Sequence, residues 1–161
     1  MSLPSYYVDV SGVETRYVQL GSGRPLLLLH GGDFRSPSHS IDWDLNISDL
    51  ASRGYRVIAL DKLGQGGTAG PTSLAGYTMR SVYEHVECFI DALGLTGNGA
   101  TADLTLVGHS RGGLPAATYA LNHPEVVRSL VIVSSATCAP EVPSDNAAFY
   151  AKAFQGMSDT P

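Results

Sequence analysis

The stretch that decides the fold is Leu104-Thr105-Leu106-Val107-Gly108-His109-Ser110-Arg111-Gly112-Gly113. A short apolar run, typical of a buried strand, ends in a G-x-S-x-G pattern, and a helical pattern follows over residues 112–122. This order of strand, turn and helix is the context in which the central serine of the pattern acts as a nucleophile. A chance match is a real alternative in a chain with 18 glycines, but chance would not supply the flanking strand and helix. We therefore predict that Ser110 is a nucleophile on a sharp turn.

The residues around Ser110 fit a turn that lifts its hydroxyl clear of the backbone. Gly108 and Gly112 stand two residues before and two residues after it, where side chains would collide. The helix that begins beside Ser110 points free N–H groups and the positive end of its dipole at the site, which favours an oxyanion. The backbone N–H of Arg111 is therefore the first predicted oxyanion donor.

A second glycine pair ends an earlier strand. The continuous apolar run over residues 26–29 is typical of a strand buried on both faces, and it stops at His30-Gly31-Gly32-Asp33. Small residues here would let backbone N–H groups approach a substrate carbonyl. We predict that Gly32, together with Asp33, supplies the second oxyanion donor. The alternative is an ordinary turn between a strand and a helix.

Strand and helix patterns alternate along the rest of the chain. Two β-rich runs, residues 6–10 and 15–20, are joined by turn residues and predict an antiparallel hairpin. The other expected elements are strands at residues 56–60 and 130–133 and helices at residues 43–51 and 78–93. Thr78 is the expected N-cap of the second of these helices, and Gly94 is its expected stop. Such alternation predicts the α/β class, with a mostly parallel sheet, flanking helices and the hairpin at an antiparallel edge.

Composition excludes several classes of function. The formal net charge is −5 and no basic run occurs, so nucleic acid is not an expected partner. The longest apolar run, residues 25–29, is far shorter than the roughly 20 residues of a membrane span. The first seven residues lack the features of a signal peptide, so we expect a cytoplasmic protein. We expect no metal and no cofactor, and we interpret Cys88 and Cys138 as free thiols.

Three segments together resemble the α/β-hydrolase superfamily. They are residues 27–32 (LLLHGG), residues 56–68 (RVIALDKLGQGGT) and residues 108–113 (GHSRGG), in the superfamily's order and spacing. The resemblance implies an α/β-hydrolase fold from about residue 6 to residue 135. Within the superfamily the chain is most similar to the branch of meta-cleavage-product hydrolases, which cut carbon–carbon bonds in 1,5-diketones from aromatic-ring degradation.

The resemblance implies a hydrolase that acts on a small carbonyl or ester substrate. Hydrolysis of the carbon–carbon bond of a meta-cleavage product is one expectation, and carboxylesterase activity is the alternative, because many esterases share the same pattern. Haloalkane dehalogenases and epoxide hydrolases resemble the chain in outline but attack with an aspartate. Ser110 therefore indicates acyl chemistry.

The other polar residues are expected to be structural. Asp61 begins an Asp-x-x-Gly-x-Gly-x-Thr segment, which resembles a structural turn of the superfamily. His109 is expected to pack rather than react, because neighbours on such a turn point apart. We place His85 on the polar face of its helix, opposite Val82 and Val86.

The catalytic acid and base that should follow the nucleophile are missing. In the superfamily the order of the catalytic residues is Ser, then Asp or Glu, then His. Residues 111–161 contain a single histidine, His123, which lies on the helix next to the nucleophile. Glu141 or Asp145 could mimic the acid, but no base remains. We expect a truncated hydrolase without its C-terminal strands and most of its lid, with residues 1–135 as the N-terminal part of the core and 136–161 as the start of the lid. An inactive fragment or a binding module is the alternative.

The strand at Leu130 to Val133 has a consequence for association. If no further strand pairs with it, it presents an apolar edge. We therefore expect self-association through this edge.

Overall fold

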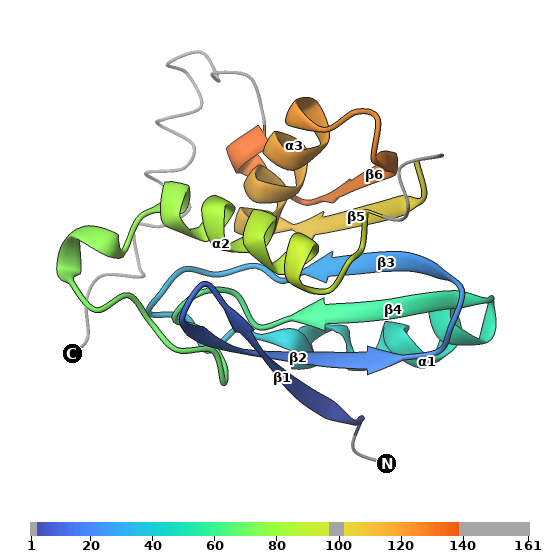
Figure 1. Cartoon of the computed structure of the whole chain (residues 1–161), viewed down its shortest axis with the longest axis horizontal. Coiled ribbons are helices and arrows are strands. Elements are labelled where there is room, and N and C mark those ends of the chain that lie inside the picture. Colours follow the sequence, from blue (N-terminus) through green and yellow to red (C-terminus); the bar gives the residue numbers. More distant parts are fainter. Residues whose placement is uncertain (1–2, 97–101, 139–161) are drawn as a thin grey trace, which may run out of the picture.

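The computed structural model describes residues 3–96 and 102–138, and six strands of this part form one sheet in the order β1-β2-β4-β3-β5-β6 (Figure 1). β1 and β2 form an antiparallel hairpin, β2 is antiparallel to β4, and the other neighbours are parallel. The predicted mixed sheet is thus confirmed. Its strands are Ser5–Val10 (β1), Val13–Leu20 (β2), Arg24–Leu29 (β3), Tyr55–Leu60 (β4), Leu104–His109 (β5) and Val127–Val133 (β6).

The hairpin closes through a two-residue turn. Val10 pairs with Val13, and the residues between them, Ser11 and Gly12, have φ angles of 53° and 86°. Positive φ at both central positions is the geometry of a type I′ turn, whose twist matches that of the flanking strands. Glycine adopts it without strain, which explains why the chain turns here.

The helices match the predicted pattern closely. They are Asp44–Ser52 (α1), Met79–Ala92 (α2) and Gly113–Asn122 (α3), and short 3₁₀ turns cover Ser40–Trp43 (η1), Leu74–Gly76 (η2), Ser110–Gly112 (η3) and Ala136–Cys138 (η4). Thr78 caps α2 as predicted, because its side chain accepts a hydrogen bond from the N–H of Ser81. Among the described residues, no helix is both long and apolar enough to cross a membrane.

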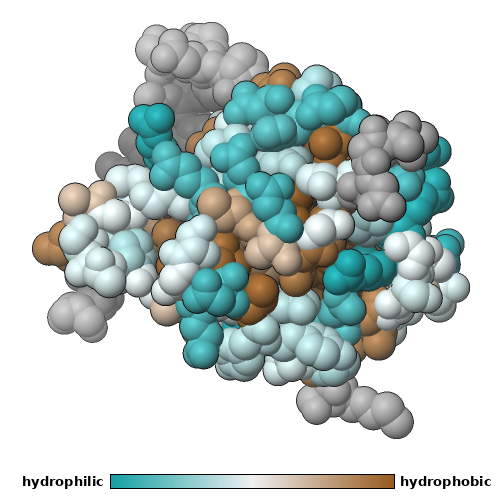
Figure 2. Space-filling view, viewed as in Figure 1, coloured by the Kyte–Doolittle hydropathy of each residue, from teal (hydrophilic) through white to brown (hydrophobic). Residues whose placement is uncertain are grey.

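The helices cover the two faces of the sheet. α2 and α3 pack on one face, where Phe89, Ile90 and Tyr119 are buried against strand residues, and α1 packs on the other through Ile47. The central strands carry the core between these layers, and Leu27 and Leu29 are fully buried. Hydrophilic residues cover much of the face in Figure 2, with hydrophobic residues between them near its centre.

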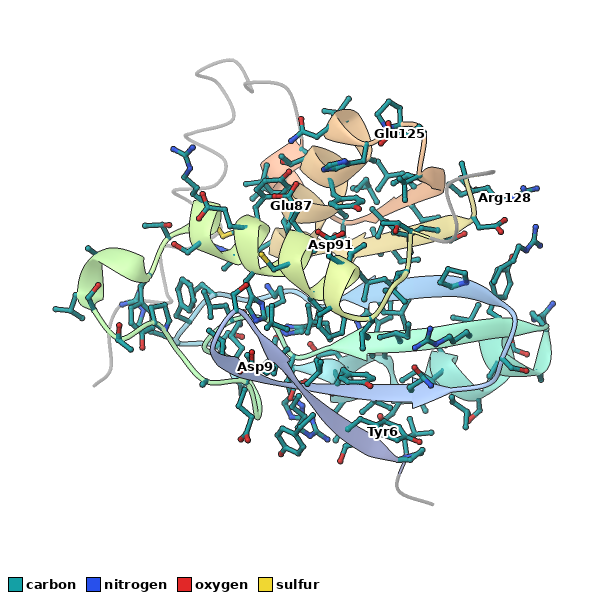
Figure 3. All side chains as sticks on the ribbon, viewed as in Figure 1. Tyr6, Asp9, Glu87, Asp91, Glu125 and Arg128 are labelled. Atoms are coloured by element: carbon teal, nitrogen blue, oxygen red, sulfur yellow. The ribbon has the colours of Figure 1, made fainter. Side chains whose placement is uncertain are left out.

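Polar contacts join α2 to α3. Glu87 of α2, labelled in Figure 3, lies 2.8 Å from Nε2 of His123 at the end of α3 and accepts a hydrogen bond from the hydroxyl of Tyr83. The hydrogen bond from His123 lowers the pKa of Glu87 below its ordinary value. His123 therefore belongs to the contact between the two helices.

The prediction for His85 was wrong. His85 is buried rather than solvent-facing, with Nε2 2.9 Å from the hydroxyl of Thr15 on β2. Burial lowers the pKa of His85 to about 4, so the ring is neutral. The helical pattern placed His85 away from the apolar residues of α2, but the hairpin packs over that side too.

β6 forms the last edge of the sheet within the described residues. It pairs with β5 on one side, and Leu130, Val131, Ile132 and Val133 are all exposed. Residues 139–161 lie outside the described residues, and they include Glu141, Asp145 and most of the predicted lid segment.

Candidate active site

Ser110 lies at the junction of β5 and α3 in a backbone conformation that is unfavourable for residues with a side chain. Its φ angle is 50°, in the left-handed region that serine rarely adopts. The two glycines predicted to be necessary lie in tight contacts. A Cβ on Gly108 would lie 2.6 Å from Cα of Gly113, and one on Gly112 would lie 2.5 Å from the carbonyl oxygen of His30. The sequence around Ser110 therefore folds into the expected strained turn.

The loop after β3 lies against this turn. β3 and β5 are parallel neighbours, and Leu29 at the end of β3 pairs with Gly108. Gly31 follows so closely that a Cβ there would lie 3.0 Å from Cβ of Ser110. The carboxyl ends of neighbouring parallel strands meet at one edge of the sheet, and this pairing brings the two predicted glycine segments together.

The loop presents unpaired donors. Gly32 has a φ angle of 72°, and within the described residues no group accepts a hydrogen bond from the N–H groups of Gly32, Asp33 or Phe34. The N–H of Arg111 lies in the first turn of a helical segment, where backbone N–H groups lack partners within the helix. N–H groups of both predicted donor segments are thus available to a negative oxygen.

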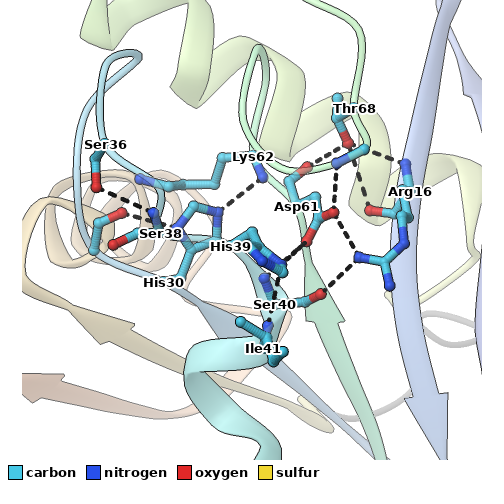
Figure 4. A network of polar contacts seen from close by, with 12 residues as sticks. Arg16, His30, Ser36, Ser38, His39, Ser40, Ile41, Asp61, Lys62 and Thr68 are labelled. Atoms are coloured by element: carbon cyan, nitrogen blue, oxygen red, sulfur yellow. Dashed lines mark hydrogen bonds and ion pairs between the residues drawn. The ribbon is translucent and has the colours of Figure 1, made fainter. Parts of the chain in front are cut away.

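His30 orders the start of the loop. Its Nδ1 lies 2.8 Å from the carbonyl oxygen of Gly31, and its Nε2 accepts a hydrogen bond from the backbone N–H of Lys62 at 3.1 Å (Figure 4). Because a carbonyl only accepts, Nδ1 carries the proton. Burial, and then the charge of Lys62, lower the pKa of His30 to about 3, so the ring is neutral.

Two further side chains of this region are not indicated by any sequence pattern. Lys62 is buried, and its Nζ donates to the carbonyl oxygen of Gly32 at 3.2 Å. Gln65 is also buried, and its Nε2 donates to the carbonyl oxygen of Asp33 at 2.6 Å. Both follow β4, the neighbour of β3. The available signal was that loops at the carboxyl ends of adjacent parallel strands meet.

A cavity of about 360 Å³ opens beside the loop. Its basic lining residues are Arg35, Lys62 and Arg111, and its acidic one is Asp33. Arg111 lies 3.9 Å from the carboxylate of Asp33, so one of the positive charges is partly balanced. Although the whole chain carries a formal charge of −5, this cavity has an excess of positive charge.

Asp61 is not among the residues that line the cavity. It is fully buried, forms an ion pair with Arg16 at 2.8 Å, and accepts hydrogen bonds from the N–H groups of Ser40 and Gly67 (Figure 4). Burial alone would raise the pKa of Asp61, but the hydrogen bonds from Gly67, Ser40 and Arg16 outweigh it and lower the pKa below its ordinary value. Its contacts are those of a structural residue.

No side chain of the described residues hydrogen-bonds the hydroxyl of Ser110. All five histidines of the sequence lie in the described part, and each has other contacts. His109 stacks edge-on against Trp43, and His39 lies 3.8 Å from Asp61. Within residues 3–96 and 102–138, the arrangement brings the hydroxyl of Ser110 together with backbone N–H groups that could bind a negative oxygen, but it places no base next to Ser110.

The sequence matches the protein family described as alpha/beta hydrolase fold over residues 24–160. It is 37% identical over 139 residues to a 2-hydroxy-6-oxo-6-(2'-aminophenyl)hexa-2,4-dienoic acid hydrolase of Metapseudomonas resinovorans. That match covers 86% of this chain and 45% of the relative, so the chain spans less than half of the relative's length.

Solved structures of two hydrolases are similar to this chain in both fold and sequence. A serine hydrolase involved in carbazole degradation is 34% identical, with a TM-score of 0.72, and the match covers 95% of this chain and 57% of that one. An epoxide hydrolase of Vigna radiata is 28% identical, with a TM-score of 0.73, and the match covers 94% of this chain and 47% of that one.

Proposed function

The chain belongs to the alpha/beta hydrolase fold family, and from this premise we propose that it is a serine-dependent hydrolase of carbonyl substrates with Ser110 as its nucleophile. One observation carries the proposal. Ser110 occupies a strained turn with a φ angle of 50°, against a loop whose N–H groups have no acceptor within the described residues. A left-handed conformation costs a non-glycine residue about 1–2 kcal/mol, and such strain clusters at active sites.

The geometry supports a simple first step. The hydroxyl oxygen of Ser110 forms a bond to the carbonyl carbon of the substrate, and the electron pair of the carbonyl bond moves to its oxygen. The N–H of Arg111 and those of Gly32 and Asp33 stabilise this oxyanion, and one such donor is typically worth about 100-fold or more in rate. The serine proton passes to a general base, which the described residues do not place beside Ser110.

The cavity favours a substrate with a carboxylate. Arg111, Arg35 and Lys62 face one acidic residue there, and guanidinium groups bind carboxylates through paired hydrogen bonds. The relative from Metapseudomonas resinovorans is named for a dienoic acid that carries an oxo group. Carbon–carbon bond hydrolysis of such an acid is therefore our first candidate reaction, and ester hydrolysis is the second, because both begin with attack on a carbonyl.

Ser110 separates this proposal from epoxide hydrolysis, despite the similarity to an epoxide hydrolase. Attack on an epoxide by an enzyme nucleophile leaves an alkyl group on that nucleophile. A carboxylate nucleophile gives an ester that water can hydrolyse, whereas serine would give a stable ether. Serine suits acyl transfer, whose ester intermediate water can cleave.

Labelling with a fluorophosphonate tests the nucleophile. We expect one adduct per chain, mapped by mass spectrometry to the peptide of Ser110 and absent from the Ser110→Ala variant. Because the described residues place no base at Ser110, added imidazole should accelerate the reaction. The matched control is Ser135→Ala, which removes a nearby hydroxyl that donates to the backbone carbonyl of Ser110.

A binding module without catalysis is the competing function. It predicts that the reagent labels several serines slowly and that Ser110→Ala labels like the wild type. That result would overturn the proposed nucleophile while leaving family membership unchanged.

A further inference from the structure

Three consecutive carbonyl groups of the loop after β3 are each held by a different side chain. The carbonyl of Gly31 is bound by His30, that of Gly32 by Lys62, and that of Asp33 by Gln65. The three side chains are buried. We call residues 31–33 the oxyanion loop. The contacts form a clamp that fixes the orientation of its successive peptide groups.

The clamp determines where the N–H groups point. A trans peptide is planar, so its N–H is directed opposite to its C=O. The Gly32 carbonyl belongs to the same peptide as the N–H of Asp33, and no cis peptide occurs in the described residues. Holding that carbonyl at Lys62 therefore directs the Asp33 N–H away from Lys62.

Resting on the proposed function, we propose that Lys62 is a positioning residue that orients and polarises the Gly32–Asp33 peptide as an oxyanion donor. The positively charged ammonium group of Lys62, hydrogen-bonded to the carbonyl oxygen, draws electron density towards that oxygen. This makes the N–H of the same peptide a stronger hydrogen-bond donor. Hydrogen bonds in a chain strengthen one another in this way. Lys62 thus acts on the oxyanion through this peptide.

The burial of Lys62 supports a role for its charge. Burying a cation without a carboxylate partner in direct contact is costly, and an apolar side chain of similar length would fill the same space without that cost. Nζ donates to a carbonyl oxygen, and no ion pair to Lys62 is formed within the described residues. The positive charge of Lys62 therefore lies next to the oxyanion loop, where it stabilises negative charge that develops nearby.

The charge of Lys62 also depends on pH near neutrality. Burial, and then the charge of Arg111, lower the pKa of Lys62 to about 8, against the opposing effects of Asp33 and Asp42. His30, which also contacts the loop, is neutral. The charged side chains of Asp33 and Arg111, 3.9 Å apart, lie at the loop as well. Lys62 is therefore protonated below about pH 8 and loses its charge above it.

The test is the rate of fluorophosphonate labelling at Ser110 in the full chain, measured between about pH 6 and about pH 10. We expect the Lys62→Met variant to react about tenfold more slowly than the wild type at neutral pH. The wild-type rate should fall above about pH 8, whereas Lys62→Met should show no such fall. Lys62→Arg, whose charge does not titrate, should keep the high rate without the fall. Arg80→Met, which removes an exposed charge on α2, is the control and should behave like the wild type.

A second measurement does not depend on reactivity or on a variant. In the wild type, the NMR signal of the Asp33 amide should shift with the titration of Lys62. The proposal is overturned if Ser110 is labelled but Lys62→Met keeps the wild-type rate and pH profile. It is also overturned if the Asp33 amide does not follow Lys62. If labelling does not require Ser110, the proposed function fails, and the amide titration alone decides the role of Lys62.

Discussion

Ser110 combines an unfavourable backbone conformation with a central place in the site. Its positive φ angle costs about 1–2 kcal/mol in an L-residue other than glycine. The G-x-S-x-G pattern with its flanking strand and helix predicted this strain, because only a sharp turn links the two elements there. The contacts of Gly108 and Gly112 show why no other residue fits at those positions.

Relief of this strain gives the first prediction. The free energy of unfolding of Ser110→Gly should be about 1 kcal/mol higher than that of Ser110→Ala, because glycine accepts the left-handed conformation and alanine does not. Chemical denaturation of both variants measures the difference. Equal stabilities would show that the turn holds no strain at this residue.

Arg111 carries the second prediction, which concerns substrate choice. Arg111→Met should lower the preference for 4-nitrophenyl hemisuccinate over 4-nitrophenyl acetate by about tenfold, since a hydrogen bond to a charged group is worth about 1.5–3 kcal/mol. Rates of acylation of Ser110 by the two esters give the preference, and Arg80→Met serves as the exposed control. An unchanged preference would remove Arg111 from carboxylate binding.

Lys62 and Gln65 mark the limit of what the sequence could predict at this scale. Both stand in a loop rich in glycine, where a polar residue is ordinarily solvated. Their partners, Gly32 and Asp33, are about 30 residues earlier in the chain. Only the pairing of β3 with β4 brings these loops together, and no local pattern records the contact.

At the scale of elements, strong local patterns predicted well. The apolar spacing of α2, its cap at Thr78 and the stop at Gly94 all appear in the structure. The hairpin was predictable for the same reason, because its turn residues suit only a tight turn. His85 was predicted wrongly because a helical pattern shows which face is apolar, but not that β2 also covers the neighbouring face.

The cap of α2 gives the third prediction. Thr78→Ala should lower the free energy of unfolding by about 1 kcal/mol, because it removes the acceptor for the N–H of Ser81. Thr78→Ser keeps that acceptor and should stay close to the wild type. A loss of equal size in both variants would show that the cap hydrogen bond is not responsible.

At the scale of the whole molecule, two buried neutral histidines couple folding to pH. The pKa of His30 is about 3 and that of His85 about 4 in the folded chain, against an ordinary pKa of 6.5. The unfolded chain therefore binds more protons, so unfolding becomes easier as pH falls below about 6.5, with a slope approaching about 1.4 kcal/mol per pH unit for each ring. The slope ends near the folded pKa values.

This coupling is the fourth prediction. The free energy of unfolding, measured by denaturation at a series of pH values, should be constant above about pH 7 with respect to these groups and fall towards about pH 4. His85→Gln should show a shallower fall, because one of the two rings is gone. A wild-type stability that does not change over this window would contradict the burial of neutral rings.

The exposed edge at β6 gives the fifth prediction. We propose that a second copy of the chain pairs with it, because the residues Leu130 to Val133 are apolar, uncharged and exposed within the described structure. Sedimentation velocity should show self-association, and Val131→Lys should reduce it, since a lysine on an edge strand opposes pairing. Leu121→Lys, at an exposed apolar residue of α3, is the control and should leave association intact. A monodisperse monomer at all concentrations would contradict this proposal.

The central claim is that Ser110 performs acyl chemistry, and the product left on the protein tests it most directly. The chain and its Ser110→Ala variant are incubated with 4-nitrophenyl acetate or with styrene oxide, and the adducts are mapped by mass spectrometry. We predict an acetyl group on Ser110 from the ester, no acetyl group on that peptide in the variant, and no adduct there from the epoxide. Acetylation that does not require Ser110, or an epoxide-derived adduct on that peptide, would contradict the claim.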